Sequence, residues 1–453
     1  MKTVVAVSTP PGSGGIAVVR MSGPEAVSIF EKAWRGGNPK EFASHTAHLG
    51  WILDASEEEI DQVVATLFLG PDSYTGEDVV EISCHGSPWI QQAIVNRLIE
   101  CGASSAGAGE FTRRAFENGR LDLAQAEGVA DMIAASSKAS ARLAASQLKG
   151  DFSRRLKSLR AKLIDIGSLL ELELDFSEED VEFADRSELI ALAREILSMI
   201  CRLADSYRSG NAFKKGIPVV IAGVPNAGKS TLLNALIGED KAIVSDIPGT
   251  TRDVIEDTVE ICGLLFRFFD TAGLRESEDK VENIGIERAR KKIAEAFILL
   301  RLFDPTQPVG EQLATLDSSA VGGDGKIINV ITKADLASID EEELKLPAGM
   351  TLIEISVPRG EGIERLKKEL HRMATSEFNP EQELVVTNAR HYEALRSAEA
   401  PLRNLIEGLE TGISCDFLAQ DLREVEHHLG AITGEVTSTD ILHSIFARYC
   451  IGK

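Results

Sequence analysis

The sequence lacks several features that would assign it to a well-defined class of protein. No apolar run approaches the roughly 20 residues of a membrane-spanning helix. The first residues run from Met1 into Pro10-Pro11-Gly12 without the long apolar region of a signal peptide. None of the six cysteines forms a C-x-x-C pair, so neither a zinc site nor a disulfide framework is indicated. We therefore expect a cytoplasmic protein without a membrane partner.

Positive charge is also scarce. The chain has 48 Lys and Arg against 71 Asp and Glu, a net charge of −23 that opposes non-specific binding to nucleic acid. No basic stripe with interleaved aromatic residues is present, so the sequence does not show how an RNA would be bound. The hydrophobic content of 43% fits a soluble globular protein, and 453 residues exceed one ordinary core.

The clearest motif is Gly223–Ser230, which reads G-x-x-x-x-G-K-S. The apolar run Ile217–Ala222 precedes it as a buried strand would, and Thr231–Ile237 follows it as a helix start. In this setting, backbone N–H groups wrap phosphate oxygens at a helix N-terminus. Lys229 can reach the β- and γ-phosphates, and Ser230 can offer its hydroxyl to Mg²⁺.

Motifs further along the chain fit a GTPase. Asp270–Gly273 reads D-x-x-G, in which Asp270 can hold Mg²⁺ through water and Gly273 can sense the γ-phosphate. Thr250 and Thr251 lie where a switch loop must supply a threonine to Mg²⁺. Leu274 stands where many GTPases have a water-positioning Gln, so the usual hydrolytic side chain is absent. Four acidic residues follow, each of which reads as a solvated surface charge from the sequence alone: Glu276, Glu278, Asp279 and Glu282.

The segment Thr332–Asp335 predicts selectivity for guanine. Most GTPases carry N-K-x-D here, and the Asp carboxylate accepts from two guanine donors that adenine lacks. Asp335 keeps that role. Lys333 is the lysine of the motif, whereas Thr332 replaces its Asn. We therefore expect GTP to be preferred over ATP, with weaker guanine affinity than in an N-K-x-D protein. Ser356 and Val357 stand where a Ser-Ala pair is usual near the guanine O6.

By composition the chain divides into four segments. Residues 1–118 mix strand and helix patterns, 119–212 are helical with about two or three long helices, 213–375 alternate strand and helix, and 376–453 are helical again. We expect a multidomain α+β and α/β protein with an N-terminal mixed α/β domain, a discontinuous helical domain, and an inserted Ras-like P-loop G domain. Two separate helical bundles are the alternative.

Two residues outside the G domain carry reactive groups. Cys450 follows a helix three residues from Lys453, and a packed small thiol is the commoner fate of such a residue. The functional interpretation is that Cys450 belongs to a site at which a substrate is chemically modified. His85 follows Cys84 and could be catalytic, but we favour a satisfied structural histidine.

Several separate motifs lie along the chain: Thr9–Gly12, Arg20–Gly23, Ser73–Asp78, Cys84–Gly86, Gly109–Phe116, Asn118–Asp122, Asn226–Ser230, Gly249–Asp253 and Cys450–Lys453. With this combination the whole chain resembles the MnmE (TrmE) family of tRNA-modifying GTPases. A regulatory GTPase of ribosome assembly is the alternative. Such a protein would be expected to carry an appended RNA-binding module, and none is visible here.

The resemblance implies a partnership and a reaction. The N-terminal domain would bind a tetrahydrofolate derivative (5-formyl- or 5,10-methylene-tetrahydrofolate) and form a homodimer. With an FAD-containing partner, MnmG (GidA), in a heterotetramer-type complex, the family installs aminomethyl or carboxymethylaminomethyl groups at C5 of the tRNA wobble uridine. The folate supplies the one-carbon unit, and ammonium or glycine the nitrogen.

The resemblance also implies residue roles. Potassium would be held by Asn226, Ser245, Ile247 and Thr250, and Mg²⁺ by Ser230 and Thr251. Glu282 aligns with the water-orienting carboxylate, and Cys450 with a residue needed for modification. Folate positions are matched by Arg20, Glu77, Arg120 and Lys453. The full set expected around GTP is Asn226, Ala227, Gly228, Lys229, Ser230, Thr231, Ser245, Asp246, Ile247, Pro248, Gly249, Thr250, Thr251, Asp270, Thr271, Ala272, Gly273, Lys333, Asp335, Ser356 and Val357.

Overall fold

The computed structural model separates the chain into two compact units. Unit 1 comprises Met1–Ala130, Leu148–Arg154 and Gly430–Lys453, and unit 2 comprises Asp131–Gln147 and Arg155–Leu429. The residues that the structure describes are 2–175, 186–238, 256–270, 296–315, 326–340, 342–344, 346–347, 350–376, 384–436, 439–447, 449 and 452. The division into four sequence segments stays a prediction.

Within its described residues, unit 1 is built on a seven-stranded sheet with the order β3-β4-β5-β6-β2-β1-β7. All neighbouring strands are antiparallel except the parallel pair β1 and β7. The strands are β1 (Val4–Val7), β2 (Gly14–Ser22), β3 (Trp34–Arg35), β4 (Thr46–Leu53), β5 (Glu59–Phe68), β6 (Val79–Gly86) and β7 (Ser104–Ser105).

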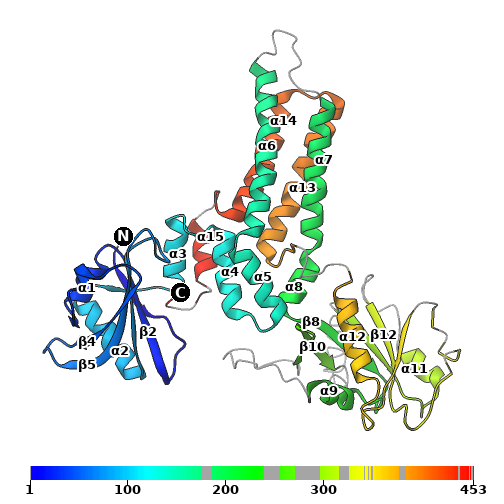
Figure 1. The fold of residues 1–453 in the computed structure, drawn as a ribbon. Helices are drawn as coiled ribbons and strands as arrows, with labels where there is room; N and C mark the ends of the chain where they lie inside the picture. Colours follow the sequence, from blue (N-terminus) through cyan, green and yellow to red (C-terminus); the bar gives the residue numbers. More distant parts are fainter. Residues whose placement is uncertain are drawn as a thin grey trace, which may run out of the picture. The chain divides into compact units, whose positions relative to one another are not determined.

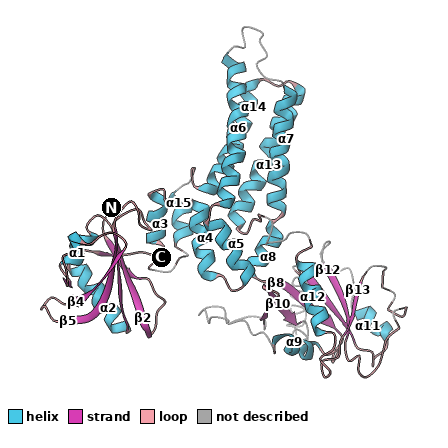
Figure 2. Cartoon of the chain, viewed as in Figure 1, coloured by secondary structure: helices cyan, strands magenta, loops and turns pink. Residues whose placement is uncertain are grey.

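The two faces of this sheet differ. Side chains alternate between faces along each strand, and one face packs against α1 (Ala26–Glu31) and α2 (Pro88–Glu100), seen beside the sheet in Figure 2. On the other face, α3 (Glu110–Glu117) covers β1, where Phe111 packs against Val4 and Ala6. A short 3₁₀ helix, η1 (Pro39–Glu41), precedes β4.

The last helix of the chain completes unit 1. Helix α15 (Thr439–Phe446) brings Phe446 into a cluster with Leu123 of α4 (Leu123–Ala134). Beyond the helix, the Tyr449 hydroxyl donates to the carbonyl of Ala126 at 2.6 Å. The two ends of the sequence therefore fold together.

Unit 2 contains the long helices of the chain, drawn in Figure 1. Helix α6 (Asp151–Asp175) has apolar residues at the spacing of one helical face. Leu156, Leu163 and Leu170 on that face are buried. Helices α7 and α13 pack side by side. The helices outside the sheet region are α5 (Lys138–Leu148), α6 (Asp151–Asp175), α7 (Arg186–Asp205), α8 (Tyr207–Lys215), α13 (Ala389–Thr411) and α14 (Cys415–Thr433).

Helices α6 and α7 match the expectation of two or three long helices over residues 119–212, but shorter helices accompany them. The described residues of this stretch hold α4, α5, α6, α7 and the start of α8. One break follows from Ser137, whose hydroxyl accepts from the Ser140 amide and so starts α5. A second follows from Gly150, whose φ of +79° ends the helical path before α6.

The α/β part of unit 2 confirms the alternation read from the sequence. Its described residues form a six-stranded sheet, ordered β13-β12-β11-β8-β10-β9, in which only β9 and β10 are antiparallel neighbours. Its strands and helices are β8 (Ile217–Gly223), α9 (Lys229–Ile237), β9 (Glu256–Ile261), β10 (Leu264–Asp270), β11 (Ile298–Phe303), α11 (Val309–Thr315), β12 (Lys326–Ile331), β13 (Thr351–Glu354) and α12 (Ile363–Ala374). Among the described helices of the whole chain, none combines the length and apolar character needed to cross a lipid bilayer.

Candidate functional site

The loop between β8 and α9 has the backbone of a phosphate cradle. Asn226 and Gly228 have φ values of +62° and +86°, so the chain turns sharply before α9 begins at Lys229. The Lys229 ammonium donates to the carbonyl oxygens of Gly223 and Val224, at 2.8 and 3.2 Å. The lysine is thus folded over the loop whose amides would receive phosphate oxygens.

Thr332 joins the base-recognition segment to this loop. Its hydroxyl lies 2.8 Å from the Ala227 carbonyl and 3.2 Å from the Phe303 carbonyl, and the residue is buried. A hydroxyl has one hydrogen and can donate to only one of these oxygens at a time. The Phe303 carbonyl also accepts from the Thr332 backbone amide at 2.9 Å. Thr332 therefore connects the strand end to the loop, with one hydroxyl donor placed between two carbonyls.

Replacing Thr332 with Asn should increase GTP affinity by about threefold to tenfold. The two N–H groups of the amide side chain would donate to both carbonyls at once, and one additional hydrogen bond of this kind contributes about 0.5–1.5 kcal/mol. Titration with a fluorescent guanine nucleotide measures the change. Thr332→Val, which removes the donor at similar size, should weaken binding, and a Thr332→Asn protein that binds no better than wild type contradicts this account.

Lys333 is held by a buried acid that the sequence reasoning missed. Its ammonium lies 2.6 Å from Asp304 Oδ2, and the Asp304 side chain is fully buried. Burial raises the pKa of the Asp304 carboxyl, but hydrogen bonds from Lys333 and Thr306 outweigh it and leave the pKa below its ordinary value. A signal existed, since Asp304 directly follows β11 and Lys333 follows the adjacent parallel strand β12.

Asp335 is prepared to accept hydrogen bonds from a guanine. The Ser356 hydroxyl donates to Asp335 Oδ1 at 2.8 Å, and this bond lowers the pKa of the carboxyl. The Ser356 amide donates to the Glu361 carbonyl at 3.1 Å, which closes the turn that contains Val357. An ionised carboxylate on an ordered turn is the acceptor that guanine recognition requires.

Other predicted residues of the nucleotide site fall outside the described part of the chain. Asp270 ends β10 opposite Ile221, which places its backbone beside the strand that leads into the loop. Its side chain, and the following residues, lie outside the described residues: Ser245, Asp246, Ile247, Pro248, Gly249, Thr250, Thr251, Thr271, Ala272, Gly273 and Glu282. Cys450 and Lys453 of unit 1 also lie outside them.

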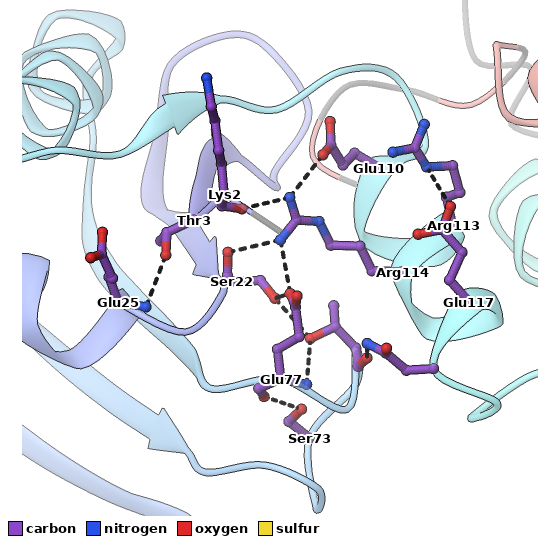
Figure 3. A network of polar contacts seen from close by, with 12 residues as sticks. Lys2, Thr3, Ser22, Glu25, Ser73, Glu77, Glu110, Arg113, Arg114 and Glu117 are labelled. Atoms are coloured by element: carbon purple, nitrogen blue, oxygen red, sulfur yellow. Dashed lines mark hydrogen bonds and ion pairs between the residues drawn. The ribbon is translucent and has the colours of Figure 1, made fainter.

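Unit 1 contains a second polar cluster, centred on Arg114 of α3 (Figure 3). Arg114 is 3% exposed and donates to Glu77 Oε2 at 2.8 Å and to Glu110 Oε1 at 2.9 Å. Its guanidinium also donates to the backbone carbonyls of Ser22 and Lys2. The sequence reasoning did not single out Arg114, although Glu110 stands four residues earlier on the same helix.

This cluster fixes Glu77, one of the predicted folate residues. Glu77 Oε2 also accepts from the Ser22 hydroxyl at 2.7 Å. Arg120 is exposed, and its side chain lies against Gly76, the residue before Glu77. The structure therefore brings Glu77 and Arg120 to one turn.

Arg20 lies on β2 and is paired within the sheet. Its guanidinium contacts Glu81 at 2.7 Å and lies over the rings of Tyr74 and Phe111. Burial raises the pKa of the Tyr74 hydroxyl, against lowering effects of the Thr112 hydrogen bond and the Arg20 charge. A cation between two aromatic rings can bind both a carboxylate and a flat ring.

The C-terminal tail reaches the same sheet. Gly452 is buried, and its carbonyl accepts from the Ser8 hydroxyl at 2.9 Å. The Ser8 amide in turn donates to the Val18 carbonyl of β2. The described residue Gly452 is thus attached to the end of β1.

Comparison with known proteins identifies similar sequences over the full length. The family model described as the MnmE helical domain matches residues 123–450, and that of the GTP-binding protein TrmE N-terminus matches residues 3–120. Proteins named tRNA modification GTPase MnmE from Parabacteroides distasonis and Porphyromonas gingivalis are 47% and 48% identical. The alignments cover 100% of this chain and 100% and 98% of those proteins.

A third relative of the same name, from Bacteroides thetaiotaomicron, is 48% identical over 100% of this chain and 99% of its own length. Among solved structures, the G domain of the T. maritima FeoB iron transporter aligns with 28% identity. That alignment covers 35% of this chain and 99% of the other, with a TM-score of 0.26, too low to support an argument about function.

Proposed function

Because the chain belongs to the MnmE family of tRNA modification GTPases, we propose that it is a potassium-stimulated GTPase that modifies the wobble uridine of tRNA. With an FAD-containing partner of the MnmG (GidA) type, it installs aminomethyl or carboxymethylaminomethyl groups at C5. The observation that carries the GTPase part is the Thr332 bond to Ala227, which joins the guanine-recognition segment to the phosphate loop.

The described residues of unit 1 fit a folate derivative. Arg20 offers a partly exposed guanidinium between aromatic rings, and Arg120 adds an exposed cation beside Glu77. The two arginines would pair with glutamate-tail carboxylates, and Glu77, oriented by Arg114, would accept pterin N–H groups. Lys453 would add a further cation. When bound, 5-formyl- or 5,10-methylene-tetrahydrofolate supplies the one-carbon unit.

The assembly that we propose is a cytoplasmic homodimer that binds the flavoprotein partner and tRNA. Nucleoside analysis of tRNA from a deletion strain tests the reaction. The modified wobble uridine should disappear in the deletion strain and return when the gene is restored. Wobble uridines that are unaltered by the deletion contradict the proposed function.

GTP hydrolysis should be several-fold faster in K⁺ than in Na⁺ at equal ionic strength. A K⁺ held by Asn226 and the switch-loop residues Ser245, Ile247 and Thr250 would place positive charge at the β/γ bridge. Ser230 and Thr251 would hold Mg²⁺ in the same site. Glu282→Ala should lower turnover by about 100-fold or more in both salts, while nucleotide binding persists. Equal wild-type rates in both salts, or unchanged turnover of the variant, argue against these roles.

A further inference from the structure

His85 and Asp61 form a carboxylate–imidazole pair at one end of the unit 1 sheet. The His85 Nδ1 atom lies 2.7 Å from Asp61 Oδ1, and the His85 backbone amide donates to Asp61 Oδ2 at 2.8 Å. Both carboxylate oxygens are therefore used to hold a single residue. Because Asp61 accepts at Nδ1, the neutral imidazole carries its proton there and presents an unprotonated Nε2.

The pair replaces regular sheet pairing. The β5–β6 ladder ends with Val64 opposite Ser83, two residues before His85. On the other side of β6, His85 remains paired with Ile16 of β2. The Asp61 carboxylate thus takes the His85 amide that a backbone carbonyl of β5 would otherwise accept.

Asp61 is buried, whereas its partner His85 is exposed. The Asp61 side chain is 7% exposed, whereas the His85 side chain is 69% exposed. Burying a carboxylate costs free energy, and an ion pair with an exposed partner contributes only about 0–1 kcal/mol. Stabilisation alone is therefore a poor reason for the arrangement. A buried acid that orients an exposed imidazole is the geometry used for proton transfer.

His85 shares its face of the sheet with the proposed modification site. Residues Glu81, Ser83 and His85 alternate on β6 with the buried Val80, Ile82 and Cys84. Glu81 pairs with Arg20, so Arg20 and His85 lie on one face, about 14 Å apart at 3.4 Å per residue.

The C-terminal tail approaches the same end of the sheet. Gly452 is bonded to Ser8, whose amide donates to Val18, and Val18 pairs with Ser83. Gly452 therefore attaches two strands away from β6. Arg20, Gly452 and His85 thus belong to one region of unit 1.

We propose that His85, oriented by Asp61, is the general acid–base residue of the modification reaction. The inference rests on the proposed function, with 5,10-methylene-tetrahydrofolate as the donor. Its one-carbon unit, as a C=N⁺ iminium, forms a bond to uridine C5 while the C=N π electrons move to the folate nitrogen, and the C5–H electron pair stays in the uracil ring. The C5 proton must leave when that bond forms. His85 Nε2 accepts it and becomes part of an imidazolium whose Nδ1–H remains on Asp61, and the proton then passes to water.

The experiment follows this proton directly. Full-length protein, the flavoprotein partner, GTP and the folate derivative are incubated with tRNA that carries tritium at uridine C5, and tritium release into water is measured. Wild type should release tritium as modification proceeds. His85→Ala should release tritium at least about 100-fold more slowly than wild type, which is the contribution of a positioned base. Its rate of GTP hydrolysis should stay within about twofold of the wild-type rate.

Rescue separates acid–base chemistry from structure. Imidazole added to His85→Ala should restore tritium release in proportion to its concentration, because free base can enter the space left by the side chain. Asp61→Asn should slow release by about tenfold or more, since an amide no longer selects the productive tautomer. His48→Ala is the control and should behave as wild type, because His48 stacks on Phe42 and bonds Thr46 elsewhere in the sheet.

The outcomes distinguish the two levels of the argument. Release by His85→Ala at the wild-type rate overturns the assignment of His85 alone. Loss of release that imidazole does not restore also overturns it, and makes His85 a structural residue. Absence of release by wild type contradicts the proposed reaction itself, and with it the role of His85.

Discussion

Replacing Arg114 with Met is expected to lower the free energy of unfolding of unit 1 by about 3–5 kcal/mol. The buried guanidinium neutralises two carboxylates, Glu77 and Glu110, that are 14% and 19% exposed. Methionine fills similar space but leaves both carboxylates without their cation. Two backbone carbonyls, those of Ser22 and Lys2, lose a donor as well.

The measurement can be confined to the right part of the molecule. All three tryptophans, Trp34, Trp51 and Trp89, lie in unit 1, so tryptophan fluorescence during urea unfolding reports on that unit. Arg113→Met is the matched control. Arg113 is 43% exposed and pairs with Glu117 at 3.3 Å, so its loss should cost less than about 1 kcal/mol. Equal stability of the two variants contradicts the central role of Arg114.

The effect should also depend on pH in a defined direction. Burial raises the pKa of Glu110, but the Gly107 amide and Arg114 lower it further, so the folded pKa lies below its ordinary value. A carboxyl with a depressed pKa stabilises the folded state above its unfolded pKa, and that stabilisation is lost as pH falls through the folded pKa. The difference between wild type and Arg114→Met should therefore shrink on acidification.

Gly452→Ala is expected to lower tRNA modification by about 100-fold, the effect of misplacing a reactive group by about 1 Å, while leaving GTP hydrolysis intact. A Cβ atom at Gly452 would lie 2.0 Å from the Val7 carbonyl oxygen, and the residue has a φ of +96°. Both the contact and the backbone conformation exclude a side chain. Gly452 must then shift away from the end of β1.

A second glycine separates the two causes. Gly412 also has a positive φ, +74°, but an added Cβ would meet only Arg186 Nη1, at 3.5 Å. Gly412→Ala thus introduces backbone strain without a clash, and it should leave modification unchanged. Modified nucleosides and phosphate release are measured in parallel for both variants. Full modification by Gly452→Ala would show that the position of the tail is not critical.

The sequence predicted the G-domain elements well because strand, loop and helix follow one another locally. The predicted strand Ile217–Ala222 coincides with β8 apart from its last residue, and the predicted helix segment Thr231–Ile237 lies within α9. Gly223–Ser230 forms the expected turn between strand and helix. In these segments the apolar runs are buried on both faces, so local pattern and tertiary burial agree.

Strand β4 was missed because its pattern is misleading. Leu49 faces outward and is 67% exposed, whereas Gly50 is buried under Trp34. An apolar residue outside and a glycine inside reverse the signal that identifies a half-buried strand. Helix α3 was also missed, since it is short and strongly polar. It begins after Gly109, in a stretch that read as a glycine-rich turn.

The polar pairs of the candidate sites were beyond the reach of the sequence for another reason. Asp304 and Lys333 stand 29 residues apart, and His85 and Asp61 stand 24 apart. Each charge alone resembles an ordinary surface charge, and only the adjacency of strands reveals its partner. The expectation of a satisfied structural histidine at His85 did not foresee a buried acid beneath an exposed ring.

The contacts of the C-terminal segment have a consequence for the synthesis of the protein. Residues Gly430–Lys453 belong to unit 1, and Tyr449 and Gly452 bond to Ala126 and Ser8. Domains generally fold as they leave the ribosome, beginning at the N-terminus. Here unit 2 can be completed while unit 1 still lacks its final pieces. A chain that stops before residue 430 can therefore possess a complete nucleotide loop but not a complete unit 1. Translation to the last residues is required before both units can be folded.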